Sequence, residues 1–163
     1  MLPDRSLRTV VSCAPGLDRE RVRGAFGDGA VISRDPLPTL LGEAHLAIVC
    51  SGTASLEAAL AGVPHEIVYR TGALNYWIAR RLVRTDRVGL SNLILGERLV
   101  REHIQDEAAP LPVATDLVRW VARPAERQEF YGGVRRLRAA CGRPGVWERT
   151  ARAVLDLVGG ETA

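Results

Sequence analysis

A small polar turn between an apolar run and a helical pattern holds the residues best suited to binding an anion. The run LAIVC (residues 46–50) leads directly into SGTASLEAALAGVP (residues 51–64). A glycine in such a turn lets the backbone approach a ligand closely, and the free N–H groups of a helix N-terminus favour a phosphate. Hydroxyl side chains in the same stretch add hydrogen-bond donors. We therefore predict a phosphate site made by Ser51, Gly52, Thr53 and Ser55.

Glu57 follows one turn into the same helical pattern. A carboxylate there could accept two hydrogen bonds from the vicinal diol of a ribose, and phosphate together with ribose describes a nucleotide. In the alternative interpretation, Ser51 or Thr53 caps the helix and Glu57 is an acid favoured by the helix dipole. Taken alone, the stretch favours this alternative, because short turns of this kind are common.

The first 110 residues alternate short apolar runs with helical patterns, which is typical of βαβ units. Runs rich in Val and Ile predict strands buried on both faces at residues 7–14, 30–33, 46–50 and 66–70. Helical patterns lie between them at residues 17–26, 37–44 and 53–62. Asp18 is placed to cap the first helix and Gly62 to end the third. The expected fold is α/β, a Rossmann-like parallel sheet with helices on both faces.

The sequence beyond Pro110 changes to helical patterns only, with apolar residues at three- and four-residue spacing. We expect this tail to pack on the sheet as its cover. The prediction is one domain over residues 1–163, with the sheet region at about 5–110 and the helical cover at about 111–158.

Composition excludes several classes of protein. A chain of 163 residues with 47% hydrophobic and 25% charged residues is typical of one globular domain with a core. The net charge is only +3, acids are interleaved with the arginines, and aromatics make up 5%, which does not favour nucleic-acid binding. Three isolated cysteines lack metal-ligand or redox spacing, and Cys13 and Cys50 are expected to be small core residues.

No apolar segment is as long as a signal peptide core or a membrane span, so a cytoplasmic protein is expected. The segment that holds Tyr76, Trp77, Arg80, Arg81 and Arg84 leaves two interpretations open. Its aromatic and basic residues could rest on an anionic membrane surface, making the protein peripheral at the inner membrane. Alternatively, Trp77 packs against the sheet while the arginines face solvent, which is the interpretation we favour.

Four stretches in order and spacing resemble the C-terminal half of lipid-A-disaccharide synthase: SGTASLEAALAGVP, VYR (residues 68–70), LNYWIARRLVR (residues 74–84) and NLILGERLVREHIQ (residues 92–105). That family consists of inverting glycosyltransferases of the GT-B architecture. The resemblance implies a donor-nucleotide domain for a UDP-linked acylated glucosamine, with no metal or other cofactor. It implies Ser51, Gly52 and Thr53 near the diphosphate and Glu57 at the ribose. Asn92 and Leu93 would belong to a second donor-side loop.

This chain departs from the family pattern at three points: Ser91 stands where a proline is usual, Arg101 where a second proline is common, and His65 where an apolar residue is usual. The resemblance also implies an N-terminal acceptor domain with the catalytic base, and a Gly-Ser-Arg loop before residue 7. We therefore expect half an enzyme that binds UDP weakly without glycosyl transfer, and assign no catalytic residue. A separately encoded N-terminal domain or self-association would cover its open cleft face.

Two other functions remain open. A UDP-sugar epimerase-type domain uses the same fold but needs acid and base groups in its cleft, and His45, His65 and His103 are scattered without such an arrangement. A stand-alone UDP-sugar-binding or regulatory domain without activity is the second alternative.

Overall fold

The computed structural model describes residues 7–72 and 87–159. In this part of the chain the strands are β1 (Thr9–Ser12), β2 (Ala30–Ser33), β3 (Ala47–Cys50), β4 (His65–Tyr69) and β5 (Glu102–Ile104). The helices of the sheet region are α1 (Arg19–Phe26), α2 (Leu37–Glu43), α3 (Thr53–Ala61) and α5 (Leu90–Leu95). After a 3-10 turn at Gln105–Glu107 come α6 (Pro110–Ala122), α7 (Pro124–Ala140) and α8 (Val146–Gly159).

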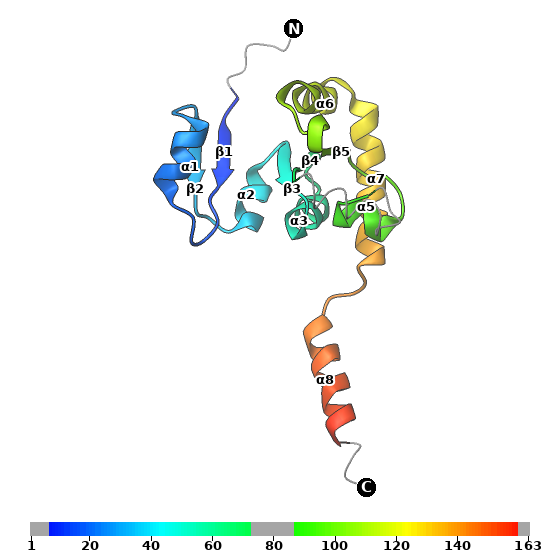
Figure 1. Cartoon of the computed structure of the whole chain (residues 1–163). Coiled ribbons are helices and arrows are strands. Elements are labelled where there is room, and N and C mark those ends of the chain that lie inside the picture. Colours follow the sequence, from blue (N-terminus) through cyan, green and yellow to red (C-terminus); the bar gives the residue numbers. More distant parts are fainter. Residues whose placement is uncertain (1–6, 73–86, 160–163) are drawn as a thin grey trace.

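All strand pairs among the described residues are parallel, which confirms the predicted fold class. The strands form two sheets, β1-β2 and β3-β4-β5, rather than one (Figure 1). Thr9 lies opposite Ala30 in the first sheet, and Ala47 lies opposite His65 in the second. The fifth strand, β5, is absent from the predicted set because it spans only three residues.

Local sequence signals explain where several helices begin and end. The carboxylate of Asp18 accepts a hydrogen bond from the N–H of Glu20 at 2.9 Å, so this residue caps α1 as predicted. Gly62 ends α3 with a φ of 80°, a left-handed conformation that glycine adopts without strain. Proline stands in the first turn of both α6 and α7, where its missing N–H costs nothing.

The core lies between the three-stranded sheet and the helices packed on it. Its buried apolar residues include Val49, Ala58, Ile67, Phe130 and Val134. His65 contacts the ring of Phe130 on α7, whereas the next residue, Glu66, contacts Trp120 on α6. Because consecutive strand residues point to opposite faces, helices cover both faces of this sheet.

Two predictions about burial are wrong. Strand residues Val10, Val31 and Ile48 are 40%, 49% and 54% exposed, so β1, β2 and β3 are not buried on both faces. Cys13 is buried as expected, but Cys50 is exposed.

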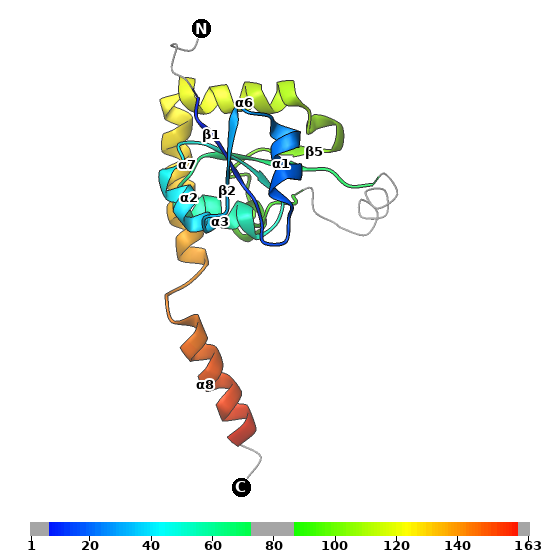
Figure 2. The same cartoon turned by 90° about the vertical axis from the view of Figure 1, so that its left-hand side faces the viewer.

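The helical tail covers the core with α6 and α7 only. Helix α8 buries no residue and leads away from the sheets in both views (Figure 1 and Figure 2). The linker before α8 contains Gly142 and Gly145 at φ values of 83° and 89°, with a proline between them, which prevents α7 from continuing. No helix in the described residues is both long enough and apolar enough to cross a membrane. The segment with Tyr76, Trp77 and its arginines lies outside the described residues.

Candidate functional site

The polar turn after β3 lies at the carboxyl end of the three-stranded sheet. Gly52 has a φ of 137°, which favours glycine, and it is the N-cap of α3 with no side chain capping the first turn. The N–H of Ser51 extends the ladder by donating to the carbonyl of Val68 at 3.3 Å. Because no side chain makes a capping hydrogen bond to α3, neither Ser51 nor Thr53 is its cap. Thr53 is exposed at the start of the helix. The turn offers backbone N–H groups and an exposed hydroxyl to an anion.

Ser55 holds this turn in shape. It is fully buried, and its hydroxyl donates to the carbonyl of Gly52 at 2.7 Å. The N–H of Ser55 donates to the same carbonyl at 3.2 Å. Because its single hydroxyl hydrogen is used inside the protein, Ser55 positions Gly52 in this structure.

Ser51 joins the turn to a second loop that is distant in sequence. Its hydroxyl donates to the carbonyl of Val88 at 2.7 Å. The next two N–H groups along this loop, those of Val88 and Gly89, donate to the carboxylate of Glu102 at 2.9 and 2.8 Å. The loop before α5 is therefore held between β5 and the turn after β3, which brings two parts of the predicted site together.

Asn92 is a buried support of the second loop. Its side-chain amide donates to the carbonyl of Val100 and to Glu102, and its oxygen accepts from the N–H groups of Leu99 and Val100. Both donors and both acceptor positions of this side chain are thus used inside the protein. Leu93, the next residue, is 40% exposed. Both residues lie in helix α5 and not in a loop, so their predicted place in a loop is wrong.

Glu57 lies in the second turn of α3 and is partly exposed. It makes no hydrogen bond or ion pair with any residue in the described part of the chain. The favourable interaction of a carboxylate with the helix dipole falls off within the first turn. The position therefore leaves this carboxylate free to meet a ligand.

Gln105 is a further residue at this end of the sheet, and the sequence analysis assigned it no role. Its side-chain amide accepts from the N–H of Thr71 at 2.8 Å and donates to the carbonyl of Thr71 at 3.0 Å. Gln105 also has a φ of 54°, which is unusual for a residue other than glycine. This strained residue links the segment that follows β4 to the end of β5. The residues before it, Arg101 to Ile104, are mostly charged or polar, so no local sequence signal marks Gln105.

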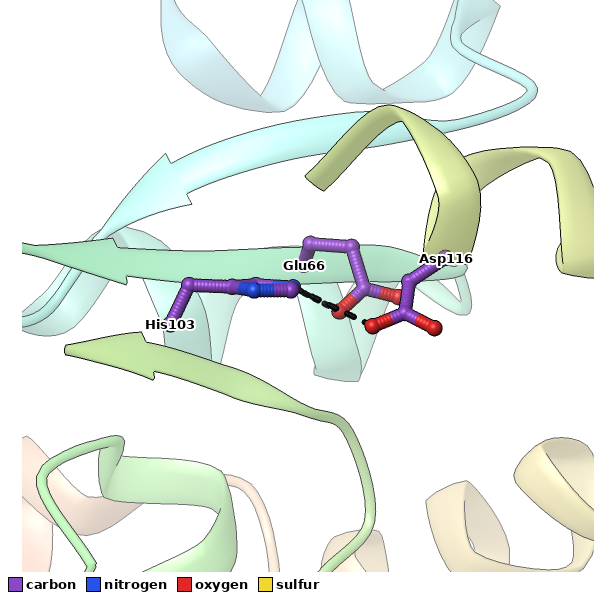
Figure 3. Close-up of side chains that lie close together, drawn as sticks. All are labelled: Glu66, His103 and Asp116. Atoms are coloured by element: carbon purple, nitrogen blue, oxygen red, sulfur yellow. Dashed lines mark hydrogen bonds and ion pairs between the residues drawn. The ribbon is translucent and has the colours of Figure 1, made fainter. Parts of the chain in front are cut away.

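A second polar group is buried under α6 and was missed in the sequence because its members are far apart in the chain. His103 on β5 lies 3.1 Å from Glu66 and 3.5 Å from Asp116, as Figure 3 shows. Glu66 also accepts a hydrogen bond from the indole of Trp120 at 2.6 Å. Burial raises the pKa of Glu66, although the hydrogen bonds from Trp120 and His103 act against this rise.

Glu66, His103 and Asp116 have the residue types of a metal site, with ligand atoms within 4.8 Å of one another. Each group is already paired: Asp116 accepts from Arg101 at 3.0 Å and from Arg119 at 2.9 Å. A metal ion would have to displace these partners, so we interpret the group as a structural link between α6 and the sheet. None of the three histidines follows the carboxyl end of a strand, where an acid or base of an epimerase-type cleft would lie.

Comparison with known proteins gives a consistent result. A family model of lipid-A-disaccharide synthetase matches residues 31–139. The lipid-A-disaccharide synthase of Geobacter metallireducens is 35% identical over 159 residues, which cover 98% of this chain and 40% of that protein. The synthase of Myxococcus xanthus is 36% identical, covering 93% of this chain and 40% of that protein. The synthase of Pseudomonas paraeruginosa is 37% identical, covering 93% of this chain and 40% of that protein. The chain therefore spans about two fifths of the length of these curated relatives.

Proposed function

Since this chain belongs to the lipid-A-disaccharide synthetase family, we propose that it forms the donor-nucleotide domain of such a glycosyltransferase. In this proposal it binds the UDP part of a UDP-linked acylated glucosamine. The names of the relatives describe the making of a lipid A disaccharide, and the part of their length outside this chain would supply the acceptor site and the catalytic base. The chain by itself would bind UDP weakly and transfer no sugar.

The observation that carries this proposal is the contact between the turn after β3 and the loop before α5. In open parallel sheets, ligands bind beyond the carboxyl ends of the strands, where such turns converge. The hydrogen bond from Ser51 to Val88 places two of these turns side by side. The uncapped first turn of α3 adds N–H groups and a positive dipole end for the diphosphate.

The hydrogen bonds divide the predicted site residues into two roles. We assign direct contact with the nucleotide to the backbone of Gly52, to Thr53, to Glu57 and to Leu93. Ser51, Ser55 and Asn92 act as positioning residues, because their polar side-chain atoms are already used inside the protein. Ser51 binds Val88, Ser55 binds Gly52, and Asn92 binds Glu102. Leu93, with its exposed side chain, would pack against the uracil or the sugar.

The proposal is tested by removing the negative charge of Glu57. The substitution Glu57→Gln keeps the size of the side chain but removes charge-assisted hydrogen bonds to the ribose. Such bonds are worth roughly 1.5–3 kcal/mol each, so UDP affinity should fall by about tenfold or more in a calorimetric titration. The thermal midpoint should stay nearly unchanged, because Glu57 has no partner in the described part of the chain.

Glu129→Gln is the matched control, because Glu129 is an exposed carboxylate on α7, a helix that does not begin at this turn. It should leave UDP affinity as in the wild type. If Glu57→Gln binds UDP as tightly as the control while its melting temperature falls, Glu57 is a helix residue without a role in binding, and the proposed ribose contact is wrong.

A further inference from the structure

At the end of β5 a side chain takes the place of the backbone in the sheet. In the ladder between β4 and β5, the N–H of Ile67 donates to the carbonyl of Arg101 at 3.0 Å. Parallel pairing repeats every two residues, so continued strands would direct the N–H of Thr71 to the backbone carbonyl of Gln105. This N–H donates instead to the side-chain oxygen of Gln105 at 2.8 Å, and the side-chain nitrogen donates to the carbonyl of Thr71 at 3.0 Å. We call this pair of hydrogen bonds the Gln105 clamp.

The backbone leaves the ladder at Gln105 itself. Its φ of 54° is the only positive value of a residue other than glycine among residues 7–72 and 87–159. A side chain makes this conformation unfavourable, and such strain persists only where surrounding contacts maintain it. The two hydrogen bonds to Thr71 are contacts of this kind. Glycine would make the same turn without strain, so the turn alone does not account for a glutamine here.

The segment held by the Gln105 clamp lies in the middle of the carboxyl edge of the three-stranded sheet. Continuing the register of the strands by one or two residues places Gly52 and Gln105 on opposite sides of Arg70. The N–H of Ser51 donates to the carbonyl of Val68 at 3.3 Å, which holds the turn after β3 against the same strand. Because the clamp fixes the residue that directly follows Arg70, it also fixes the backbone of Arg70 beside this turn.

Arg70 carries the positive charge of this edge. The residues that follow β3, β4 and β5 are SGT (51–53), RTG (70–72) and QDE (105–107). Arg70 is exposed and makes no hydrogen bond or ion pair with any residue in the described part of the chain. Asp106 and Glu107 are exposed carboxylates on the β5 side, away from β3. They would repel an anion toward the turn after β3, which leaves Arg70 between the acidic side and the turn.

We infer that Gln105 is a positioning residue that places Arg70 against the diphosphate of the bound nucleotide. This inference rests on the proposed function, which supplies the ligand, and adds a cation to the site. The uncapped first turn of α3 offers N–H groups and only about half an elementary positive charge, less than the negative charge of a diphosphate. An arginine supplies a full charge and can bind two phosphate oxygens with parallel N–H groups.

The role of Gln105 is indirect, because both polar atoms of its side chain bind the backbone of Thr71. Without the Gln105 clamp, the segment after β4 would lose these two bonds to the end of β5, and Arg70 would move with it. The binding of a diphosphate would then have to order this arginine as well, at a cost in affinity.

The test titrates UDP into variants of the full chain, with binding followed by amide shifts in NMR spectra. Arg70→Gln removes the charge and should lower UDP affinity by about tenfold, the loss expected for one charge-assisted hydrogen bond. Gln105→Gly removes both the clamp and the backbone strain, so its thermal midpoint should stay near that of the wild type. Its UDP affinity should nevertheless fall by about threefold or more. Gln105→Asn, which also tolerates the left-handed conformation but is one methylene shorter, should behave in the same way.

The combination of the two substitutions gives a readout that a purely structural role would not change. If Gln105 acts by placing Arg70, the double variant should bind UDP within about twofold of Arg70→Gln, because the clamp then has no cation to position. Arg70→Lys keeps the charge and should recover part of the affinity. The matched control is Arg152→Gln, which removes the same charge from an exposed position on α8 and should bind UDP like the wild type.

The Gln105 clamp is also tested without any ligand. Hydrogen exchange at the amide of Thr71 should be about tenfold faster in Gln105→Gly than in the wild type, because the acceptor of this N–H is gone. Arg70→Gln should leave this exchange unchanged. Equal exchange in Gln105→Gly and the wild type would show that the clamp does not hold this segment, which overturns the inference.

Failure of the inference differs from failure of the proposed function. If the wild type binds UDP and Arg70→Gln binds it equally well, Arg70 does not contact the diphosphate, and the inference alone is overturned. Independent, additive losses in the double variant overturn the link between Gln105 and Arg70. If the wild type does not bind UDP, the proposed function is wrong and the inference falls with it.

Discussion

The two halves of this α/β unit differ in how completely they are built. At β4, helices α6 and α7 cover opposite faces, and Ile67 and Leu137 are fully buried. Around β1 and β2, helix α1 buries no residue and two strand valines are largely exposed. Both halves have the same parallel βαβ pattern in the sequence, so the difference does not come from propensity. It comes from tertiary packing, because α6 and α7 bury side chains beside the three-stranded sheet whereas α1 buries none beside the other.

Polar groups follow the same division. In the three-stranded half, Glu102 accepts two hydrogen bonds from the loop before α5 and one from Asn92 in α5. The side chain of Asn92 donates two hydrogen bonds and accepts two. In the two-stranded half, Arg19 and Arg34 reach single backbone carbonyls. A packed core and a connected polar network support each other, because packing excludes water from the hydrogen bonds. The predicted binding turn follows β3, at the edge of the three-stranded half.

The largest effect should come from truncating the core of the three-stranded half. Phe130 is 2% exposed and contacts the rings of His65, Trp120 and Tyr131. Phe130→Ala should lower the free energy of unfolding by about 3–5 kcal/mol in urea titrations, from lost transfer energy and the cavity left behind. The control is Phe26→Ala in α1, where the ring is 57% exposed, and its cost should stay within about 0.5 kcal/mol. Equal costs at both sites would show that the two halves are equally packed.

A smaller effect is expected where the second loop passes over the core. A Cβ on Gly89 would overlap Cδ1 of the fully buried Ile67 and lie 3.0 Å from Oε1 of Glu102. Gly89→Ala should therefore lower the free energy of unfolding by about 1–3 kcal/mol, through overpacking and a disturbed Glu102. Gly42→Ala in α2 meets nothing within 4 Å and should raise the stability by about 0.5–1 kcal/mol through helix propensity.

In thermal melts, Gly89→Ala should lower the melting temperature and Gly42→Ala should raise it. This result would distinguish the crowded position of Gly89 from the open position of Gly42. A stabilising Gly89→Ala would mean that the loop before α5 has room to move away from Ile67, and that the contact with Glu102 does not hold it. The UDP affinity of Gly89→Ala should also fall, since Ser51 binds the carbonyl of the adjacent Val88.

The sequence predicts the fold class and most elements because their signals are local. Val-rich runs, the cap at Asp18 and the left-handed Gly62 each act within a few residues. The division into two sheets could not be predicted, because it depends on which strand lies beside β1. The three-residue β5 was missed for the same reason, since its pairing with β4 and not its composition makes it a strand.

The candidate site divides in a similar way. The turn at Ser51, Gly52 and Thr53 has a local signature and lies where the sequence predicts. The supports of this turn are not local: Val88 is 37 residues away from Ser51, and Gln105 is 34 residues away from Thr71. Glu66, His103 and Asp116 also meet only in the folded chain. Nucleotide binding by these residues is a prediction that the Glu57 titration tests.

The smallest effect at neutral pH concerns a polar side chain in the packed half. His65 is fully buried beside Phe130, its Nδ1 lies 2.7 Å from the carbonyl of Val63, and Nε2 has no partner in the described residues. Burial lowers the pKa of His65 below its ordinary value of 6.5, with the bond to Val63 acting against this. The unfolded chain therefore binds more protons than the folded chain below about pH 6.5. The stability from neutral His65 is present above that pH and is lost as the pH falls toward the folded pKa.

His65→Leu should remove this loss, because leucine cannot be protonated. At pH 7.5 the variant and the wild type should melt within about 2–3 °C of each other, since the lost bond to Val63 offsets the removal of an unpaired polar atom. Between pH 7.5 and 5.5 the wild type should lose more of its melting temperature than the variant. The raised pKa of Glu66 has the opposite effect on stability, which is lost as the pH rises above 4.5. Glu66 is present in both the wild type and His65→Leu, so this effect does not distinguish them. His45→Leu, at an exposed position, should retain the wild-type dependence on pH. If His65→Leu and wild type lose the same number of degrees, acid sensitivity does not arise from this buried imidazole, and the packed half tolerates its charge.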